Sequence, residues 1–343
     1  MNVFKGCIIQ CDENNSVAKY LVEHDGKIVF VGNKLDDEYS MYPVTDLENK
    51  AIMPSFVNPY YQISKEGISV LSFSKFYLDT VNLQLTNGIS FCNYILESDF
   101  LIPGTSNDFH ANFCTLFSSE KKKSRRDENQ VFVVDMGQIQ DSNVQELEIA
   151  HKLGKQIFIH VDSDSYFDMA VSTLSKILSD SKNNEIGHTI VVDSSIHDVD
   201  FKSCRKFNIG IILKNDFSKD FYFPIGNCIR SNVLLSFALE KMPYEYLLNS
   251  ILSADDSLKT SLFEIFRCLT YNSAKICHAE NYVGSLEKGK FADFVILNQS
   301  PYACDKEKLS DIKIEKVFIK GNEMSVLNQS AISALISGVF KRK

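Results

Sequence analysis

The sequence has 343 residues, enough for one large α/β barrel with a small appendage or for two to three ordinary domains. Its 44% hydrophobic and 23% charged content is ordinary for a soluble globular protein, and no apolar run approaches the ~18 residues that cross a bilayer. A net charge of −8 argues against general binding to nucleic acid or an anionic membrane, because both require basic surface. The first residues lack a basic segment followed by an apolar one, so we predict a cytoplasmic location.

The cysteines and the one basic cluster point to no metal knuckle or nucleic-acid site. Nine cysteines lie scattered without a C-x-x-C pair, which predicts free thiols in a reducing compartment. The basic cluster Lys121–Arg126 is flanked by acidic residues and is typical of a solvated loop.

Short alternating strands are predicted near both ends of the chain. At the beginning and near the far end they are Val3–Gln10, Val17–His24, Gly26–Gly32, Gly289–Leu297 and Ile314–Gly321. Neither group has enough strands to bury a core alone. We therefore predict that residues 1–52 and 284–325 pair into one composite β-sandwich, followed by a helix over 326–343.

Between these regions, apolar strands alternate with helical patterns, which is typical of parallel α/β architecture. The clearest unit is strand Val131–Asp135, helix Val144–Leu153 and strand Lys155–His160. Later predicted strands are His188–Asp193, Ile211–Leu213 and, as the last one, Phe221–Gly226, followed by helices over Tyr244–Leu252 and Leu258–Leu269. Residues 53–283 thus predict a (β/α)8 TIM-like barrel, distorted or shortened around Glu97–Asn129, where the pattern is weak.

Four phrases carry a family resemblance, and they stand in the family's order. The stretch Ala51–Ile63 resembles the first barrel strand of the amidohydrolase superfamily, which reads Pro-Gly-Phe-Val/Ile-Asp/Asn-x-His-x-His. The most specific phrase is Asn272-Ser-Ala-Lys275 followed by Val283–Leu297, which is similar to the family's return from barrel to sandwich. Gly26–Gly32 resembles its opening hairpin, and Gly226–Asn232 resembles its strand-eight phrase.

The resemblance is to the cytosine-deaminase-like branch, which includes chlorohydrolases and deaminases of adenosine, guanine and aminofutalosine. It implies a divalent metal, zinc or iron, held by His-x-His on strand one, His on strands five and six, and Asp on strand eight. It also implies a glutamate that shuttles protons three residues after the strand-five histidine. Such a metal lowers the pKa of its bound water from about 15.7 to about 7 and so supplies hydroxide at neutral pH.

The positions that match those ligands are Tyr60, Gln62, His160, Asp193 and Asn227, and Ser163 takes the place of the proton shuttle. Only His160 keeps the family's residue. Amide oxygens are poor partners for zinc or iron beside imidazole and carboxylate, and an amide has no titratable site. The resemblance therefore implies a vestigial binding site, with no catalytic residue assigned and no metal cofactor expected.

Two interpretations stay open. In the first, the chain is a pseudoenzyme that binds a small molecule or partners a second copy or an active paralogue. In the alternative, it is an active hydrolase or deaminase that cleaves non-peptide C–N bonds of a nucleoside- or nucleobase-like substrate. That alternative uses either no metal or a rebuilt metal site, and the rebuilt site would consist of His160 and Asp193, joined by Asp162 or His197 on loops at the same face.

Two other residues are predicted to lie outside any metal site. His188 precedes Asp193 by five residues, and this odd separation places it on the opposite face of the strand. Asp293 lies in the most specific phrase, where we expect it to form a turn.

Overall fold

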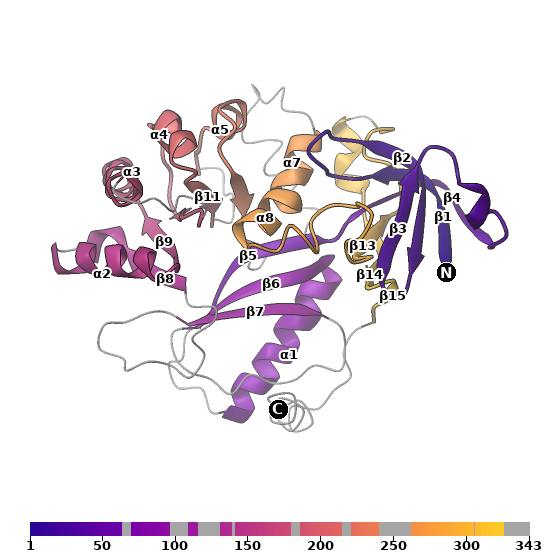
Figure 1. The fold of residues 1–343 in the computed structure, drawn as a ribbon, viewed down its shortest axis with the longest axis horizontal. Coiled ribbons are helices and arrows are strands. Elements are labelled where there is room, and N and C mark those ends of the chain that lie inside the picture. Colours follow the sequence, from indigo (N-terminus) through magenta and orange to yellow (C-terminus); the bar gives the residue numbers. More distant parts are fainter. Residues whose placement is uncertain are drawn as a thin grey trace.

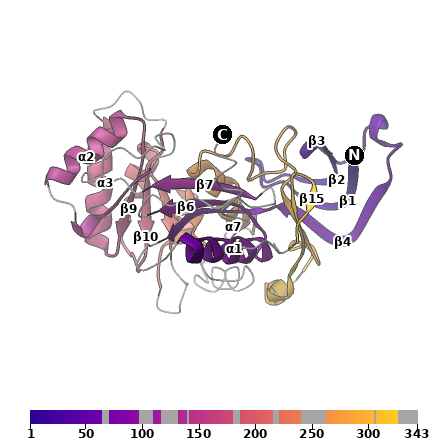
Figure 2. The same ribbon diagram turned by 90° about the horizontal axis from the view of Figure 1, so that it is seen from below.

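The computed structural model describes residues 1–63, 70–96, 109–115, 131–138, 141–179, 186–214, 221–239, 262–304 and 306–325. A mixed sheet lies at one end of the molecule and an arc of parallel strands covered by helices lies at the other (Figure 1). A second, shorter arc of parallel strands runs between them, with helix α1 alongside (Figure 2). Within these residues no helix combines the length and apolar character needed to cross a bilayer.

The mixed sheet contains strands from both ends of the chain. Its order is β15-β14-β13-β4-β1-β2-β3. The junction between the two ends is antiparallel, with Phe294 opposite Pro54 and Leu297 opposite Ala51. The strands are β1 (Asn2–Ile9), β2 (Val17–His24), β3 (Lys27–Gly32), β4 (Val44–Pro54), β13 (Phe294–Leu297), β14 (Ile314–Ile319) and β15 (Asn322–Glu323), with a 3-10 turn η1 at Asp37–Tyr39.

This sheet curls around its own core. Three strand steps separate β1 from β14, which would place them about 14 Å apart in a flat sheet. The rings of Phe4 on β1 and Phe318 on β14 nevertheless have centroids only 6.0 Å apart. A β-bridge between Lys27 and Phe291 links the outer edge of β3 to the segment before β13. The predicted pairing of the two ends is thus observed as one curled sheet, while the domain boundaries at 52 and 284 stay predictions.

In the second part, the described residues form eight parallel strands in two hydrogen-bonded arcs of three and five strands. The first arc is β5 (Phe56–Ile63), β6 (Ile89–Leu96) and β7 (His110–Thr115). The second is β8 (Val131–Asp135), β9 (Gln156–Val161), β10 (Thr189–Val192), β11 (Gly210–Leu213) and β12 (Leu235–Phe237). The parallel α/β class predicted for this region is therefore confirmed.

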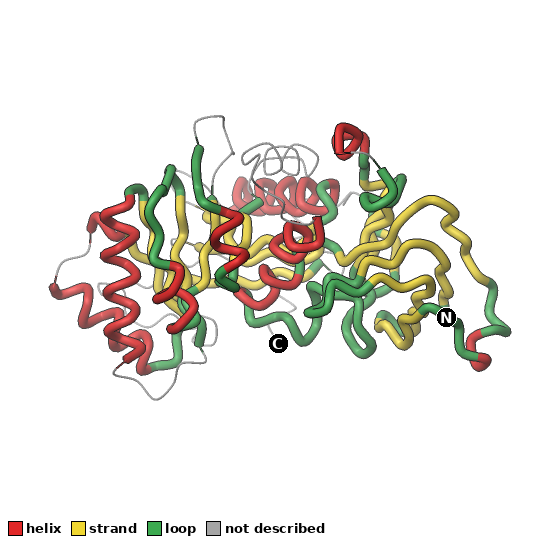
Figure 3. Tube along the Cα trace, turned by 90° about the horizontal axis from the view of Figure 1, so that it is seen from above, coloured by secondary structure: helices red, strands yellow, loops and turns green. Residues whose placement is uncertain are grey.

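Helices lie outside the strands, as Figure 3 shows for the five-stranded arc. Strand residues of odd number in β9, such as Ile157 and Ile159, pack in one apolar core with α3 residues Phe167 and Leu174. The helices are α1 (Val70–Thr86), α2 (Asp141–Lys152), α3 (Asp164–Ser179), α4 (Phe201–Lys206), α5 (Ile225–Arg230), α7 (Leu262–Leu269) and α8 (Tyr271–Ile276), with 3-10 segments η2 (Met136–Gln138) and η3 (Lys306–Asp311).

The two arcs are joined on one side by a side chain. In the described part of the chain no strand pairing connects β7 with β8 or β12 with β5. The buried amide of Asn58 on β5 instead donates to the carbonyl of Leu239, 2.9 Å away, and accepts from the Leu239 N–H at 3.1 Å. This amide therefore takes the place of a backbone ladder between the first and the last parallel strand.

Residues of even number on β9 face the inside of the arcs. Phe158 packs there with Tyr60 of β5, Val191 of β10 and Ile212 of β11. Since neighbouring residues in register share one face of a sheet, the partners of His160, Asp135 on β8 and Val191 on β10, also face inward. The inner face therefore runs from Gln156 at the start of β9 to His160 near its end.

One predicted strand is wrong, and some predictions lie outside the described residues. Phe221–Gly226 is not a strand, because Pro224 lacks an N–H for a ladder and leads directly into α5. The eighth strand is the three-residue β12 instead. The predicted helix Tyr244–Leu252, the helix over 326–343 and most of Glu97–Asn129 fall outside the described ranges.

Candidate functional site

The candidate site lies where the inward-facing strand residues reach the C-terminal ends of the parallel strands. Active sites of parallel α/β barrels form at this end. Tyr60 and Gln62 come from β5 and His160 comes from β9, while Asp193 and Lys214 directly follow β10 and β11. The structure thus brings together four of the six predicted site residues, Tyr60, Gln62, His160 and Asp193.

Tyr60 is the centre of this cluster. Its side chain is fully buried, and its ring packs edge-on against His160 with centroids 5.2 Å apart. The Tyr60 hydroxyl oxygen lies 2.6 Å from His160 Nε2 and 3.0 Å from Gln62 Oε1. The phenol therefore links the two side chains that stand at the predicted ligand positions.

His160 connects Tyr60 to a carboxylate. Its Nδ1 lies 3.4 Å from Asp193 Oδ1, and the two side chains are 14% and 40% exposed. If the phenol O–H donates its hydrogen bond to Gln62 Oε1, the Nε2–H of His160 donates a hydrogen bond to the phenol oxygen. If the phenol O–H instead donates to His160, the Nε2 lone pair accepts that hydrogen bond. Both arrangements engage His160 Nε2 in a hydrogen bond with the phenol.

Two inward-facing residues near the cluster, Lys214 and Asp135, were not predicted from the sequence. The Nζ of Lys214 lies 5.7 Å from the centre of the Tyr60 ring and adds a positive charge to the cluster. Asp135 ends β8 in register with His160, and its Oδ1 accepts the Gly137 N–H at 2.9 Å. The alternation Val131-x-Val133-x-Asp135 would have indicated that Asp135 faces inward, since residues two apart share a face.

Ser163 and Asn227 do not join the cluster. The Ser163 hydroxyl accepts the Tyr166 N–H at 3.4 Å and so caps α3. Asn227 lies in the first turns of α5, exposed, where its Oδ1 accepts from Arg230 at 2.5 Å. The assignment of Asn227 to the end of strand eight is therefore wrong. The position after β12 that faces the barrel interior is Ala238, which has no polar group.

The loop residues proposed for a rebuilt metal site have other partners. Asp162 is exposed. Asp164 accepts the N–H groups of Asp198 at 2.9 Å and His197 at 2.7 Å, and these backbone hydrogen bonds hold the pKa of Asp164 below its ordinary value. The His197 imidazole is 65% exposed, and its Nδ1 lies 3.6 Å from Asp164 Oδ2. These residues fasten the loop after β10 to the start of α3 rather than extending the Tyr60 cluster.

The described side chains in the barrel mouth do not fit a zinc or iron site. Zinc takes three or four imidazole, thiolate or carboxylate ligands. Among the residues that the structure describes, no group of three or more His, Cys, Asp or Glu is arranged to hold a metal ion. The ligands of the usual type described near the cluster are His160, Asp193 and the inward-facing Asp135 of β8, which are not arranged as a metal-binding group, and the Tyr60 hydroxyl engages the histidine.

His188 lies outside the arcs, as the odd spacing predicts. Its Nδ1 accepts the Ile157 N–H at 3.1 Å, which leaves Nε2 to donate to His151 Nδ1 at 2.9 Å. Burial lowers the pKa of His188 to about 3, so this imidazole is neutral at pH 7. The pair has a structural role between β9 and α2.

Asp293, which we expected only to form a turn, is an anchor between the curled sheet and β7. It is 2% exposed, and its Oδ2 lies 2.9 Å from His110 Nε2. Its Oδ1 accepts the Lys320 N–H at 2.8 Å, so the turn role is also present.

In the described residues, eight parallel strands whose C-terminal side chains converge are coupled to a sheet from both chain ends, which defines an α/β barrel-like scaffold. Comparison with known proteins agrees. Residues 244–324 match the Amidohydrolase family. This match lies in the part of the chain that carries the most specific phrase of the family resemblance. No curated protein sequence matches the chain.

Solved structures of similar fold cover nearly the whole chain. A zinc-bound adenosine deaminase from Xanthomonas campestris has 11% identity and a TM-score of 0.69, covering 99% of this chain and 97% of its own. A variant of atrazine chlorohydrolase from Arthrobacter aurescens, complexed with zinc and atraton, has 13% identity and a TM-score of 0.66, covering 99% of both chains. Guanine deaminase from C. acetobutylicum, with guanine bound, has 14% identity and a TM-score of 0.59, covering 94% of this chain and 100% of its own.

Proposed function

We propose that this chain is an amidohydrolase-fold pseudoenzyme that has lost metal-dependent deamination and hydrolysis and uses the barrel mouth to bind a small molecule. The observation that carries the proposal is the 2.6 Å contact between the Tyr60 hydroxyl and His160 Nε2. It occupies the one remaining imidazole of the family's ligand set. The proposal includes the cytoplasmic location and the absence of nucleic-acid and membrane partners predicted above.

The alternative, an active hydrolase of C–N bonds with a rebuilt metal site, requires His160 and Asp193 to converge with Asp162 or His197. The contacts of His197 with Asp164 and the exposure of Asp162 argue against that convergence. Pairing with a second copy or with an active paralogue is compatible with the pseudoenzyme proposal and adds no requirement at the cluster.

The first test measures the metal content and activity of purified protein from cells supplied with zinc, iron and manganese. We expect substoichiometric metal by mass spectrometry and no ammonia release from purine, pyrimidine or aminofutalosine-like substrates. Stoichiometric metal together with ammonia release from any of these substrates would refute the proposal.

The second test rebuilds the missing ligands. The double variant Tyr60→His, Gln62→His frees His160 Nε2 and adds two imidazoles beside it, so we expect a gain in bound zinc. The matched control Tyr60→Phe, Gln62→Leu frees the same nitrogen without adding a donor and is expected to bind no more metal than the wild type. If the wild type already binds as much zinc as the rebuilt variant, the 2.6 Å contact does not exclude a metal.

A further inference from the structure

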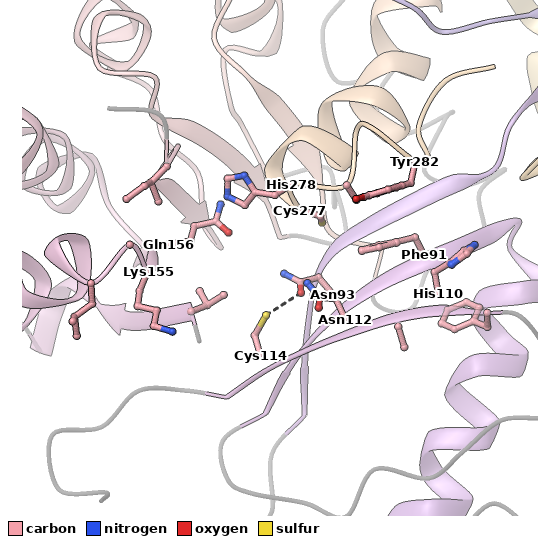
Figure 4. A pocket seen from close by; sticks show the side chains of 17 residues that line it. Phe91, Asn93, His110, Asn112, Cys114, Lys155, Gln156, Cys277, His278 and Tyr282 are labelled. Carbon is pink, nitrogen blue, oxygen red and sulfur yellow. Dashed lines mark hydrogen bonds between the residues drawn. The ribbon is translucent and has the colours of Figure 1, made fainter. Parts of the chain in front are cut away.

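A cavity of about 740 Å³ lies at the opposite, N-terminal ends of strands β6 to β9. It falls where β7 and β8, the facing edges of the two arcs, are not paired with each other among the described residues. Asn93, Asn112 and Cys114 line one side, and Lys155 and Gln156 line the other (Figure 4). Its volume is within the range of roughly 300–1,000 Å³ typical of small-molecule sites.

The cavity is separate from the Tyr60 cluster. Gln156 and His160 lie four residues apart on β9, which corresponds to about 13 Å along a strand. Between them the fully buried rings of Phe158 and Tyr60 pack together with centroids 5.8 Å apart. A molecule in this cavity would therefore not touch the barrel mouth.

The lining is unusual because inward positions of such a barrel normally carry bulky apolar side chains. Here the positions in register on β6 and β7 are Asn93 and Asn112, and Gln156 faces them from β9. A buried amide without hydrogen bonds is costly, so polar residues at these positions need partners. Asn93, which is 2% exposed, donates to the Pro59 carbonyl at 3.1 Å and accepts from Cys114 Sγ at 3.1 Å.

The orientation of Gln156 is fixed by its own hydrogen bonds. Its Nε2 donates to the carbonyls of Gly187 at 3.0 Å and Ile276 at 2.9 Å, which uses both amide hydrogens. The Oε1 atom is left to point across the cavity toward Asn93 (Figure 4). Because this Gln156 oxygen has a fixed position, a ligand in the cavity could satisfy it with an N–H donor.

The remaining walls add flat rings and positive charge. His110 and Tyr282, which both line the cavity, stack on the same ring of Phe291 with centroids 5.1 Å and 6.1 Å away. Tyr282 is 57% exposed at the rim. Lys155 is cationic, and the described lining residues include no aspartate or glutamate. Such walls disfavour a cation and suit a planar molecule.

We propose that this cavity binds a small aromatic molecule that bears an amide-like edge, an N–H donor beside a carbonyl acceptor, and no positive charge. Nicotinamide is a suitable probe because it has one aromatic ring and one carboxamide. 3-Methylpyridine lacks the amide edge, and 1-methylnicotinamide keeps the edge but adds a positive charge. Nicotinate replaces the amide by a carboxylate and tests the contribution of Lys155.

Ligand-observed NMR titration on the full chain gives the affinity of each probe. We expect nicotinamide to bind with a dissociation constant of roughly millimolar, and 3-methylpyridine and 1-methylnicotinamide to bind roughly tenfold more weakly or not at all. Asn112→Val, at a half-buried strand position, should weaken nicotinamide binding roughly tenfold, whereas Asn14→Ala at an exposed turn should not. Lys155→Gln should weaken nicotinate, whereas the exposed Lys152→Gln should not.

A crystal structure of the wild type soaked with nicotinamide provides a measurement that does not depend on whether a variant folds. Density between Gln156 and Asn112 supports the proposal, and density confined to the barrel mouth or the surface overturns it. Absence of saturable nicotinamide binding, or equal binding of 3-methylpyridine, would also overturn it. Since none of these readouts involves metal or the Tyr60 cluster, they are independent of the proposed function.

Discussion

Replacing Asn58 tests whether one side chain holds the first and last parallel strands together. Asn58 is fully buried, and its amide makes two hydrogen bonds with the backbone of Leu239, which is itself 7% exposed. The same Oδ1 accepts the Tyr60 N–H at 3.3 Å. Asn58→Ala removes all of these bonds and leaves buried backbone groups without a partner.

The expected loss of stability follows from the buried backbone groups that lose their hydrogen-bond partners. A buried donor or acceptor without a partner costs about 1–3 kcal/mol, and Leu239 loses a partner for one of each. We therefore expect Asn58→Ala to lower the free energy of unfolding by about 4 kcal/mol. This is a large share of the roughly 5–15 kcal/mol that stabilises most native proteins.

Urea unfolding followed by far-UV circular dichroism measures this difference, and it suits a chain that contains no tryptophan. The exposed residue Asn14 provides the matched control, because Asn14→Ala should change the stability by less than about 0.5 kcal/mol. A loss below about 1 kcal/mol for Asn58→Ala would refute the argument that this amide connects the two arcs.

Two further predictions concern a buried imidazole and a pair of glycines. Burial lowers the pKa of His188 to about 3 in the native state, whereas a histidine in the unfolded chain has a pKa of about 6.5. Between these pH values the unfolded chain binds a proton at this histidine and the native chain does not. His188 should therefore lower the free energy of unfolding, measured by urea unfolding, by about 1.4 kcal/mol for each pH unit below about 6.5, down to pH 3. The variant His188→Gln should lack this contribution to the pH dependence of stability. A pH dependence equal to that of the wild type would contradict a neutral imidazole in the native state. Gly284 has φ +90°, and an added Cβ would lie 2.6 Å from that of Ala274, whereas Gly289 has φ +94° and open space around it. In thermal and urea unfolding, Gly289→Ala should cost about 1–2 kcal/mol for its backbone alone and Gly284→Ala distinctly more; equal costs would show that the close approach is relieved by small shifts.

The alternation of apolar residues predicted much of the fold because it reports burial directly. Val131–Asp135 has the bounds predicted for it, and the strand predicted at Lys155–His160 is displaced by one residue. β12 was missed because three residues within the apolar run after Val233 are too few for a period to show. The local phrase around Asn227 resembled the family's strand eight, yet Pro224 places it in a helix.

The candidate site was predictable in its positions but not in its contacts. The resemblance placed Tyr60 and His160 together although 100 residues separate them, and the structure agrees. That the phenol bonds the imidazole follows only from three-dimensional geometry. Lys214 was missed because a lysine is not a residue of the family's ligand set, although its position two after Ile212 places it on the inner face.

The seam between β4 and β13 has a consequence for biosynthesis. About 240 residues separate Pro54 from its partner Phe294, so at roughly 5–20 residues per second the ribosome needs on the order of 10–50 s between them. During that interval one edge of β4 has no neighbour and offers its backbone to any passing strand. The open edge of β4 is therefore a site where the nascent chain can mispair until the last strands leave the ribosome.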